Sequence, residues 1–102
     1  MNGDFFEALS NPYRRQIVQM LKWKNHSVNE ITAALGISQP SVSRHLDVLK
    51  HAGLVVAERR ANQVIYSLNI SVMQEIMGKL VEFIEDIKGI KKYDNSESAY
   101  HY

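Results

Sequence analysis

The order of apolar and polar residues predicts two helices at the start of the chain. The first is short and runs from Asp4 to Leu9, with Asp4 as its cap. Asn11 and Pro12 then suit the N-cap and the first position of a second helix. The apolar face of that second helix consists of Ile17, Val18, Met20 and Leu21.

Two arginines, Arg14 and Arg15, occupy the first turn of this second helix. Positive charge there meets the positive end of the helix dipole, so both side chains need other partners. We expect a buried carboxylate for at least one of them. A DNA phosphate is the alternative partner.

A helix-turn-helix follows. Ser27 and Glu30 have the spacing of a capping box and open a helix that Gly36 ends. Ser38 is an N-cap residue for the next helix, which we expect to continue to Ala52. Two short helices joined by a tight turn that contains glycine form this motif.

The second helix of this motif has two different faces. Val42, Leu46 and Leu49 recur at helical spacing and predict the buried face. The other face carries short or planar polar groups and has no acidic side chain before Asp47. These groups are Gln39, Ser41, Arg44 and His45, with Ser43 at the edge. Such a face can lie in a DNA major groove, although an amphipathic helix with a solvated face is the alternative on this stretch alone.

After Gly53 the spacing of apolar residues changes from that of a helix to that of β-strands. Residues 54–60 and 64–68 predict two strands joined by a polar turn over residues 61–63. The tip of this hairpin carries Arg59, Arg60, Asn62 and Gln63. A basic hairpin beside a helix-turn-helix is typical of a wing that contacts DNA phosphates or the minor groove. A solvated hairpin end is the alternative.

A last helix is predicted from Val72 to Lys88, capped by Asn69 or Ser71. Its apolar stripe has heptad spacing and is wider than the core of one small domain needs. This excess favours a second copy of the chain as partner rather than closure of the core alone. The stripe consists of Met73, Ile76, Met77, Leu80, Phe83, Ile84 and Ile87.

Composition narrows these expectations. The chain of 102 residues predicts one domain over residues 1–90 and a polar, disordered tail over 91–102. The net charge is +1, with +3 in residues 1–71 and −2 in residues 72–102, so the basic excess lies with the helix-turn-helix and the hairpin. No apolar run is long enough to span a membrane and no cysteine is present. The cytoplasm is therefore the expected location, and no cofactor is predicted.

Four motifs in this order resemble those of bacterial ArsR-type winged-helix repressors. They are residues 8–17 (Ala-Leu-Ser-Asn-Pro-Tyr-Arg-Arg-Gln-Ile), 37–46 (Ile-Ser-Gln-Pro-Ser-Val-Ser-Arg-His-Leu), 49–55 (Leu-Lys-His-Ala-Gly-Leu-Val) and 65–69 (Ile-Tyr-Ser-Leu-Asn). The resemblance implies a mainly helical (α+β) winged helix-turn-helix with the element order α-α-α-α-β-β-α. It also implies a homodimer that binds an inverted-repeat operator. In that family the first and last helices form the dimer interface, which adds Phe5 and Phe6 to the stripe of the last helix.

The sequence departs from the metal-sensing members of that family. Residues 30–32 are Glu-Ile-Thr where thiolate sensors carry a Cys-x-Cys pair, and the last helix contains no histidine. Carboxylates alone bind soft and borderline metals poorly. We therefore predict no metal site, and the inducing ligand or protein stays undefined.

The leading hypothesis is a regulator that binds double-stranded DNA. Arg44 suits guanine and Gln39 suits adenine, whereas Ser38 and Ser41 suit a phosphate equally well. The predicted DNA-binding residues are Ser38, Gln39, Ser41, Ser43, Arg44, His45, Arg59, Arg60, Asn62 and Gln63. A winged-helix module that binds protein is the second hypothesis, supported by the low net charge. An enzyme is the least favoured class, because the chain has no phosphate loop, HExxH motif or nucleophile elbow.

Overall fold

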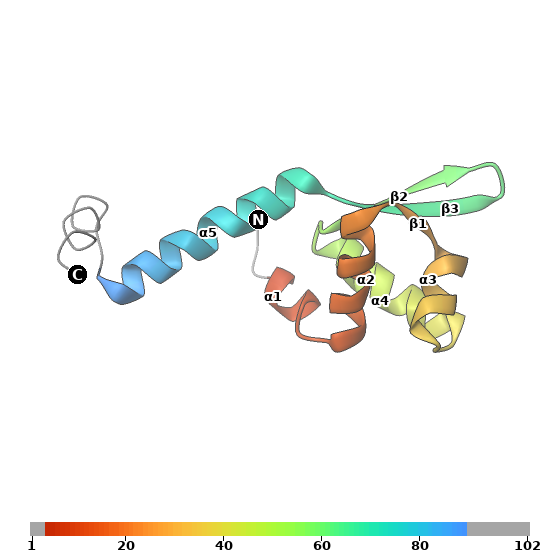
Figure 1. Ribbon diagram of the computed structural model, residues 1–102, viewed down its shortest axis with the longest axis horizontal. Helices are drawn as coiled ribbons and strands as arrows, with labels where there is room; N and C mark the ends of the chain where they lie inside the picture. Colours follow the sequence, from red (N-terminus) through yellow and green to blue (C-terminus); the bar gives the residue numbers. More distant parts are fainter. Residues whose placement is uncertain (1–3, 90–102) are drawn as a thin grey trace. The chain divides into compact units, whose positions relative to one another are not determined.

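The computed structural model describes residues 4–89 (Figure 1). The elements are α1 (Asp4–Ala8), α2 (Pro12–Trp23), β1 (His26–Ser27), α3 (Val28–Leu35), α4 (Gln39–His51), β2 (Val55–Arg60), β3 (Gln63–Leu68) and α5 (Ile70–Lys88). This arrangement is a mostly helical winged helix-turn-helix with a small antiparallel sheet, as predicted. No helix among the described residues is long and apolar enough to cross a membrane.

The chain divides into two compact units, residues 1–72 and residues 73–102. The first unit holds every element up to the first turn of α5, and the second holds the rest of α5. The predicted disordered tail, residues 91–102, lies outside the described residues.

The core of the first unit joins three helices to the start of the wing. Its most completely buried large side chains come from α2, α3, α4 and the residue before β2. They are Ile17, Ile31, Val42, Leu46, Leu49 and Leu54. The predicted apolar face of α4 is therefore confirmed, and its burial fixes which face of α4 remains exposed.

The predicted helix starts at Asn11 and Ser27 are formed as expected, whereas Asp4, the predicted cap of the first helix, is itself the first residue of α1. The Asn11 side chain accepts hydrogen bonds from the backbone N–H groups of Tyr13 and Arg14 at the start of α2. Ser27 and Glu30 form the full capping box of α3. Asn69, one of the two candidates, accepts from the backbone N–H of Val72, and α5 begins two residues earlier than predicted.

The sheet contains one strand that the sequence pattern missed. Its order is β1-β3-β2, all antiparallel, with His26 opposite Tyr66. The predicted element order, which has no strand before the hairpin, was therefore wrong for His26 and Ser27. A strand of two residues shows no alternation of its own, and its pairing with β3 is a long-range contact. The true order of elements is α-α-β-α-α-β-β-α.

Candidate nucleic-acid interface

The helix-turn-helix is closed by a short, well-defined turn. Gly36 has φ +69°, a left-handed conformation, and its N–H donates to the carbonyl of Thr32 to end α3. Two residues later Ser38 adopts an extended conformation and caps α4. The turn between α3 and α4 is thus defined by Gly36, which ends α3, and by Ser38, which caps α4 two residues later.

The N-terminal half of α4 exposes polar side chains opposite the core. Gln39, Ser43 and Arg44 are exposed, while Ser41 is half-buried. The Ser38 hydroxyl accepts from the N–H of Ser41 and donates to the Ser41 hydroxyl, 2.9 Å away. Five of the six residues predicted on this helix therefore have exposed or half-buried side chains in its N-terminal half, where hydrogen-bond donors and the helix dipole favour an anion.

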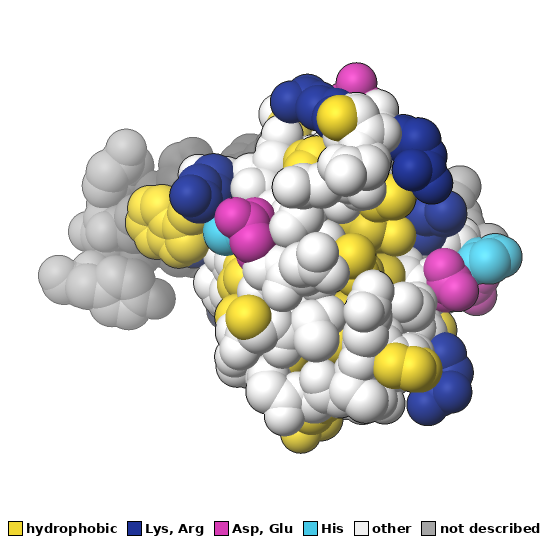
Figure 2. All heavy atoms as spheres, turned by 90° about the vertical axis from the view of Figure 1, so that its right-hand side faces the viewer, with side chains coloured by type: hydrophobic (Ala, Val, Ile, Leu, Met, Phe, Trp, Pro, Cys, Tyr) yellow, Lys and Arg dark blue, Asp and Glu magenta, His cyan; other side chains and the backbone are white. Residues whose placement is uncertain are grey.

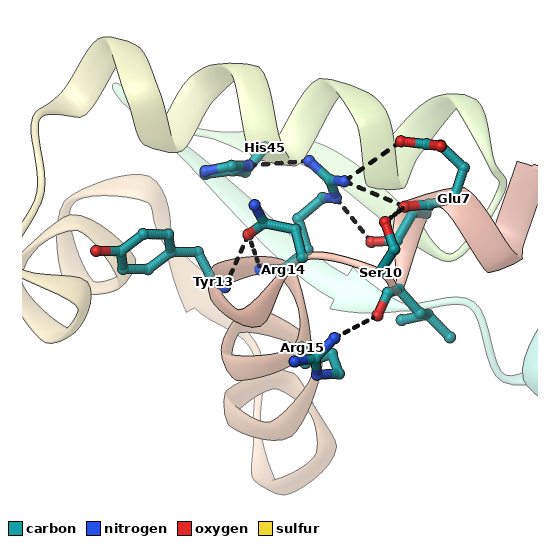
Figure 3. Close-up of polar contacts among 9 residues, drawn as sticks. Glu7, Ser10, Tyr13, Arg14, Arg15 and His45 are labelled. Carbon is teal, nitrogen blue, oxygen red and sulfur yellow. Dashed lines mark hydrogen bonds and ion pairs between the residues drawn. The ribbon is translucent and has the colours of Figure 1, made fainter.

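The sixth residue, His45, lies on the flank of α4 that faces α2. Its ring is half-buried, with its centroid 5.7 Å from that of Tyr13 and its Nδ1 atom 3.1 Å from Arg14 Nη1 (Figure 3). Burial, followed by the charges of Arg14 and Arg44, lowers the pKa of His45 below its usual 6.5. His45 is therefore tied to the body of the domain, unlike the exposed groups beside it.

No Asp or Glu among residues 4–89 is buried, so the buried carboxylate expected for the arginines of α2 is not found there. Arg14 is buried, but its Nε and Nη2 donate to the backbone carbonyls of Ala8 and Glu7. Arg15 donates to the carbonyl of Leu9 (Figure 3). The exposed Glu7 carboxylate lies 3.9 Å from Arg14. The prediction was wrong because carbonyls at the end of a helix, which no sequence motif marks, are also acceptors.

The wing carries the predicted polar groups at its tip. Arg59, Arg60, Asn62 and Gln63 are all exposed, and the register pairs Arg60 with Gln63 across a two-residue loop. Arg60 also forms an ion pair of 3.2 Å with Glu58 on the same strand. Arg59 is therefore the less neutralised cation of the wing.

Figure 2 shows the first unit from the end where the wing tip and the helix-turn-helix lie. Lys and Arg side chains line the upper and right-hand margins of this face, with some Asp or Glu side chains among them, and most of the middle is uncharged. A largely uncharged surface with cations at its margins suits a duplex, because base edges need hydrogen bonds and phosphates need positive charge.

Comparison with known proteins agrees with this geometry. Residues 11–56 match the family model described as bacterial regulatory protein, arsR family. The transcriptional repressor SdpR of Bacillus subtilis is 37% identical over 82 residues, which cover 80% of this chain and 91% of SdpR. This chain belongs to the ArsR family.

Two further proteins are similar to this chain in sequence or structure. The repressor SmtB of Mycobacterium tuberculosis is 42% identical over 65% of this chain, which spans only 49% of SmtB. The solved structure of HlyU from Vibrio cholerae superimposes with a TM-score of 0.63 and 34% identity over 76% of this chain and 87% of HlyU. The chain is accordingly a DNA-binding transcriptional regulator and not an enzyme.

The predicted dimer residues of this ArsR-family chain differ in exposure. Phe5 is buried within the chain, whereas Phe6, which touches it, is exposed. On α5, Ile76 is buried and Met73 half-buried. The other side chains of the stripe are exposed, namely Met77, Leu80, Phe83, Ile84 and Ile87. Phe5 and Ile76 thus have little surface left to offer a partner.

Two contacts in this site were not predicted from the sequence. The Arg14–His45 contact joins residues 31 apart, and the ion pair of Arg60 with Glu58 reduces its charge. The alternation of β2 could have revealed the second feature, because residues 58 and 60 lie on the same side of a strand. Within residues 4–89 no three His, Cys, Asp or Glu side chains are grouped as a metal site.

Proposed function

We propose that this chain represses transcription by binding an inverted-repeat operator as a homodimer, with α4 in the major groove of each half-site. The observation that carries the proposal is the surface of α4 from Gln39 to Arg44. It is exposed, polar and free of acidic side chains, and the helix-turn-helix holds it at the wing end of the domain.

The residues have different roles in this proposal. Arg44 reads guanine and Gln39 reads adenine, because their planar ends match the major-groove edges of these bases. Ser38, Ser41 and the N-terminus of α4 contact a phosphate, with Ser43 beside them. The wing contacts the DNA backbone through Arg59, Asn62 and Gln63. Arg60 contacts the backbone as well when its ion pair with Glu58 is broken.

The exposed stripe of α5 supports the homodimer. Exposed fractions of 65% at Met77, 58% at Phe83 and 67% at Ile87 are high for large apolar side chains. A two-fold dimer places two copies of α4 about one turn of DNA apart, roughly 34 Å. The operator is therefore expected to be pseudo-palindromic.

The release signal is proposed not to be a soft or borderline metal. The chain has no cysteine, and the histidines of the described residues have other contacts or lie apart from one another. A regulator of this kind acts in the cytoplasm, where the DNA is.

The test starts with DNA selected by the parent protein from a random duplex library. Arg44→Ala should lose about tenfold or more in affinity for the selected duplex and relax the preference at one base pair. Arg59→Ala with Arg60→Ala should weaken binding to selected and scrambled duplexes alike and flatten the salt dependence. Lys79→Ala on α5 is the control for loss of one charge.

Each result bears on one part of the proposal. Unchanged binding by Arg44→Ala removes the base-reading role, and an unchanged salt slope removes the wing. If the parent selects no duplex at all, the protein-binding alternative replaces the proposal.

A further inference from the structure

Arg14 is a buried cation whose contacts join three parts of the first unit. Its Nε donates to Ala8 O at 2.7 Å and its Nη2 to Glu7 O at 3.1 Å, both at the carboxyl end of α1. Its Nη1 lies 3.1 Å from Nδ1 of His45 on α4 (Figure 3). The guanidinium thus links α1, α2 and α4 in one hydrogen-bond cluster.

The contact fixes the protonation of His45. A guanidinium has only donors, so Nδ1 must accept, and the ring proton of neutral His45 must sit on Nε2. No hydrogen bond involves Nε2, yet no buried side-chain nitrogen among the described residues lacks a partner. Nε2 is therefore open to solvent, as a donor.

His51 on the same helix has the opposite arrangement. Its Nδ1 lies 2.9 Å from the carbonyl oxygen of Asp47, which can only accept. Its Nδ1 must therefore carry a proton. The two histidines of α4 supply an internal comparison for any measurement of ring protonation.

The charges around His45 are unfavourable for a second proton. Arg14 from α2 and Arg44 from α4 are the cations that act on it, and Tyr13 of α2 lies beside its ring. The exposed carboxylate of Glu7 on α1 lies 3.9 Å from Nη2 of Arg14, whereas His45 contacts Nη1. Among the described residues, α3 and β2 give His45 no hydrogen bond or ion pair. Protonation would remove the acceptor of Arg14 and place two cations in contact.

We propose that Arg14 is a positioning residue of the DNA-reading surface, holding α4 against the end of α1 and keeping His45 neutral with its Nε2–H outward. The inference rests on the proposed function. It adds that acid weakens the interface through His45, because the doubly protonated ring can no longer accept from Arg14. The helix that reads DNA then loses this hydrogen-bonded link to α1 and α2, although its apolar packing remains.

The first experiment needs no DNA. Nitrogen NMR of the imidazole rings in the parent at pH 8 should show the Nε2–H form for His45 and a protonated Nδ1 for His51. Arg14→Met should return His45 to a mixture of tautomers. Arg15→Met is the matched control, since Arg15 also contacts the end of α1 but does not touch His45. A protonated Nδ1 on His45 of the parent overturns the inference.

The second experiment measures binding to the selected duplex at pH 8 and pH 5.5. Arg14→Met should bind about tenfold more weakly than Arg15→Met at pH 8. His45→Asn keeps an acceptor near the position of Nδ1 but cannot titrate. Acidification should therefore weaken the parent severalfold more than this variant, which a merely structural role of His45 would not produce.

The outcomes separate the two proposals. If the parent binds no duplex, the proposed function fails, while the NMR result still decides the arrangement of His45. If the parent binds but its pH profile matches that of His45→Asn, or Arg14→Met binds as well as Arg15→Met, the positioning role is overturned and DNA binding stands.

Discussion

At the residue scale, the two arginines in the first turn of α2 are explained by the helix that precedes them. The carbonyls of Glu7, Ala8 and Leu9 lie at the carboxyl end of α1, where no further turn of helix satisfies them. Cations are favourable at such an end. The arginines are therefore well placed with respect to α1, although they lie at the unfavourable end of α2. Both arginines thereby join α2 to the end of α1, and Arg14 also contacts His45 of α4.

Glu30 gives a residue-scale prediction about pH. Its carboxylate accepts from the N–H of Ser27 and pairs with His26, and these contacts, in this order, hold the pKa of Glu30 below its usual 4.5. A carboxylate with a lowered pKa stabilises the fold above its ordinary pKa, and the effect is lost as the pH falls through the lower, folded value. Glu30→Gln keeps an oxygen acceptor but cannot titrate, so its stability should change less between about pH 5 and pH 3.

Urea unfolding of parent and variant across this range measures the difference. Glu75→Gln removes one carboxylate from an exposed position of α5 and serves as the control. Equal pH slopes for the parent and Glu30→Gln would show that the capping carboxylate is not ionised preferentially in the folded state.

At the element scale, local chemistry decided what the sequence could predict. The caps Asn11, Ser27 and Ser38 each bond to amides within three residues, so their helices were predicted with nearly correct starts. β1 and the Arg14–His45 contact depend on residues that are distant in the chain, and pairings of this kind leave no periodic pattern. The exposed face of α4 followed from its buried face alone. The sequence pattern did not show which flank of α4 packs against α2, and His45 lies on that flank.

The wing gives an element-scale prediction. Its loop contains only Ala61 and Asn62, and Ala61 has φ +56° while every other described non-glycine residue has a negative φ. A positive φ at the first loop position alone is typical of a type II′ turn, where glycine is favoured. Ala61→Gly should therefore raise the free energy of unfolding by about 0.5–1 kcal/mol.

Chemical denaturation measures this gain, with Asn62→Gly as the matched control. Asn62 has an ordinary φ, so glycine there only increases the freedom of the unfolded chain and should not stabilise. Stabilisation of equal size in both variants would contradict the assigned turn.

At the scale of the whole molecule, the proposed two-fold operator requires two copies of this chain. In that proposal the first unit supplies one α4 and one wing for one half-site. The exposed stripe of α5 is the surface proposed for the second copy. Reading two half-sites depends on joining the copies, since the affinity gained from the second half-site is lost when they separate.

The variant Ile84→Glu tests dimerisation without disturbing the folding of each protomer. Ile84 is 49% exposed within one chain, so a carboxylate there should leave the folding of a protomer almost unchanged. In a dimer joined through α5 the same carboxylate would be buried against apolar side chains, which is costly without a partner charge. Sedimentation should therefore show a monomer for Ile84→Glu and a dimer for the parent. Affinity for the selected duplex should fall about tenfold or more.

Gln74→Glu, which adds the same charge at an exposed polar position of the same helix, should stay dimeric and bind DNA as the parent does. A dimeric Ile84→Glu would place the interface elsewhere, whereas a monomer with full affinity would show that one copy of α4 and its wing suffice.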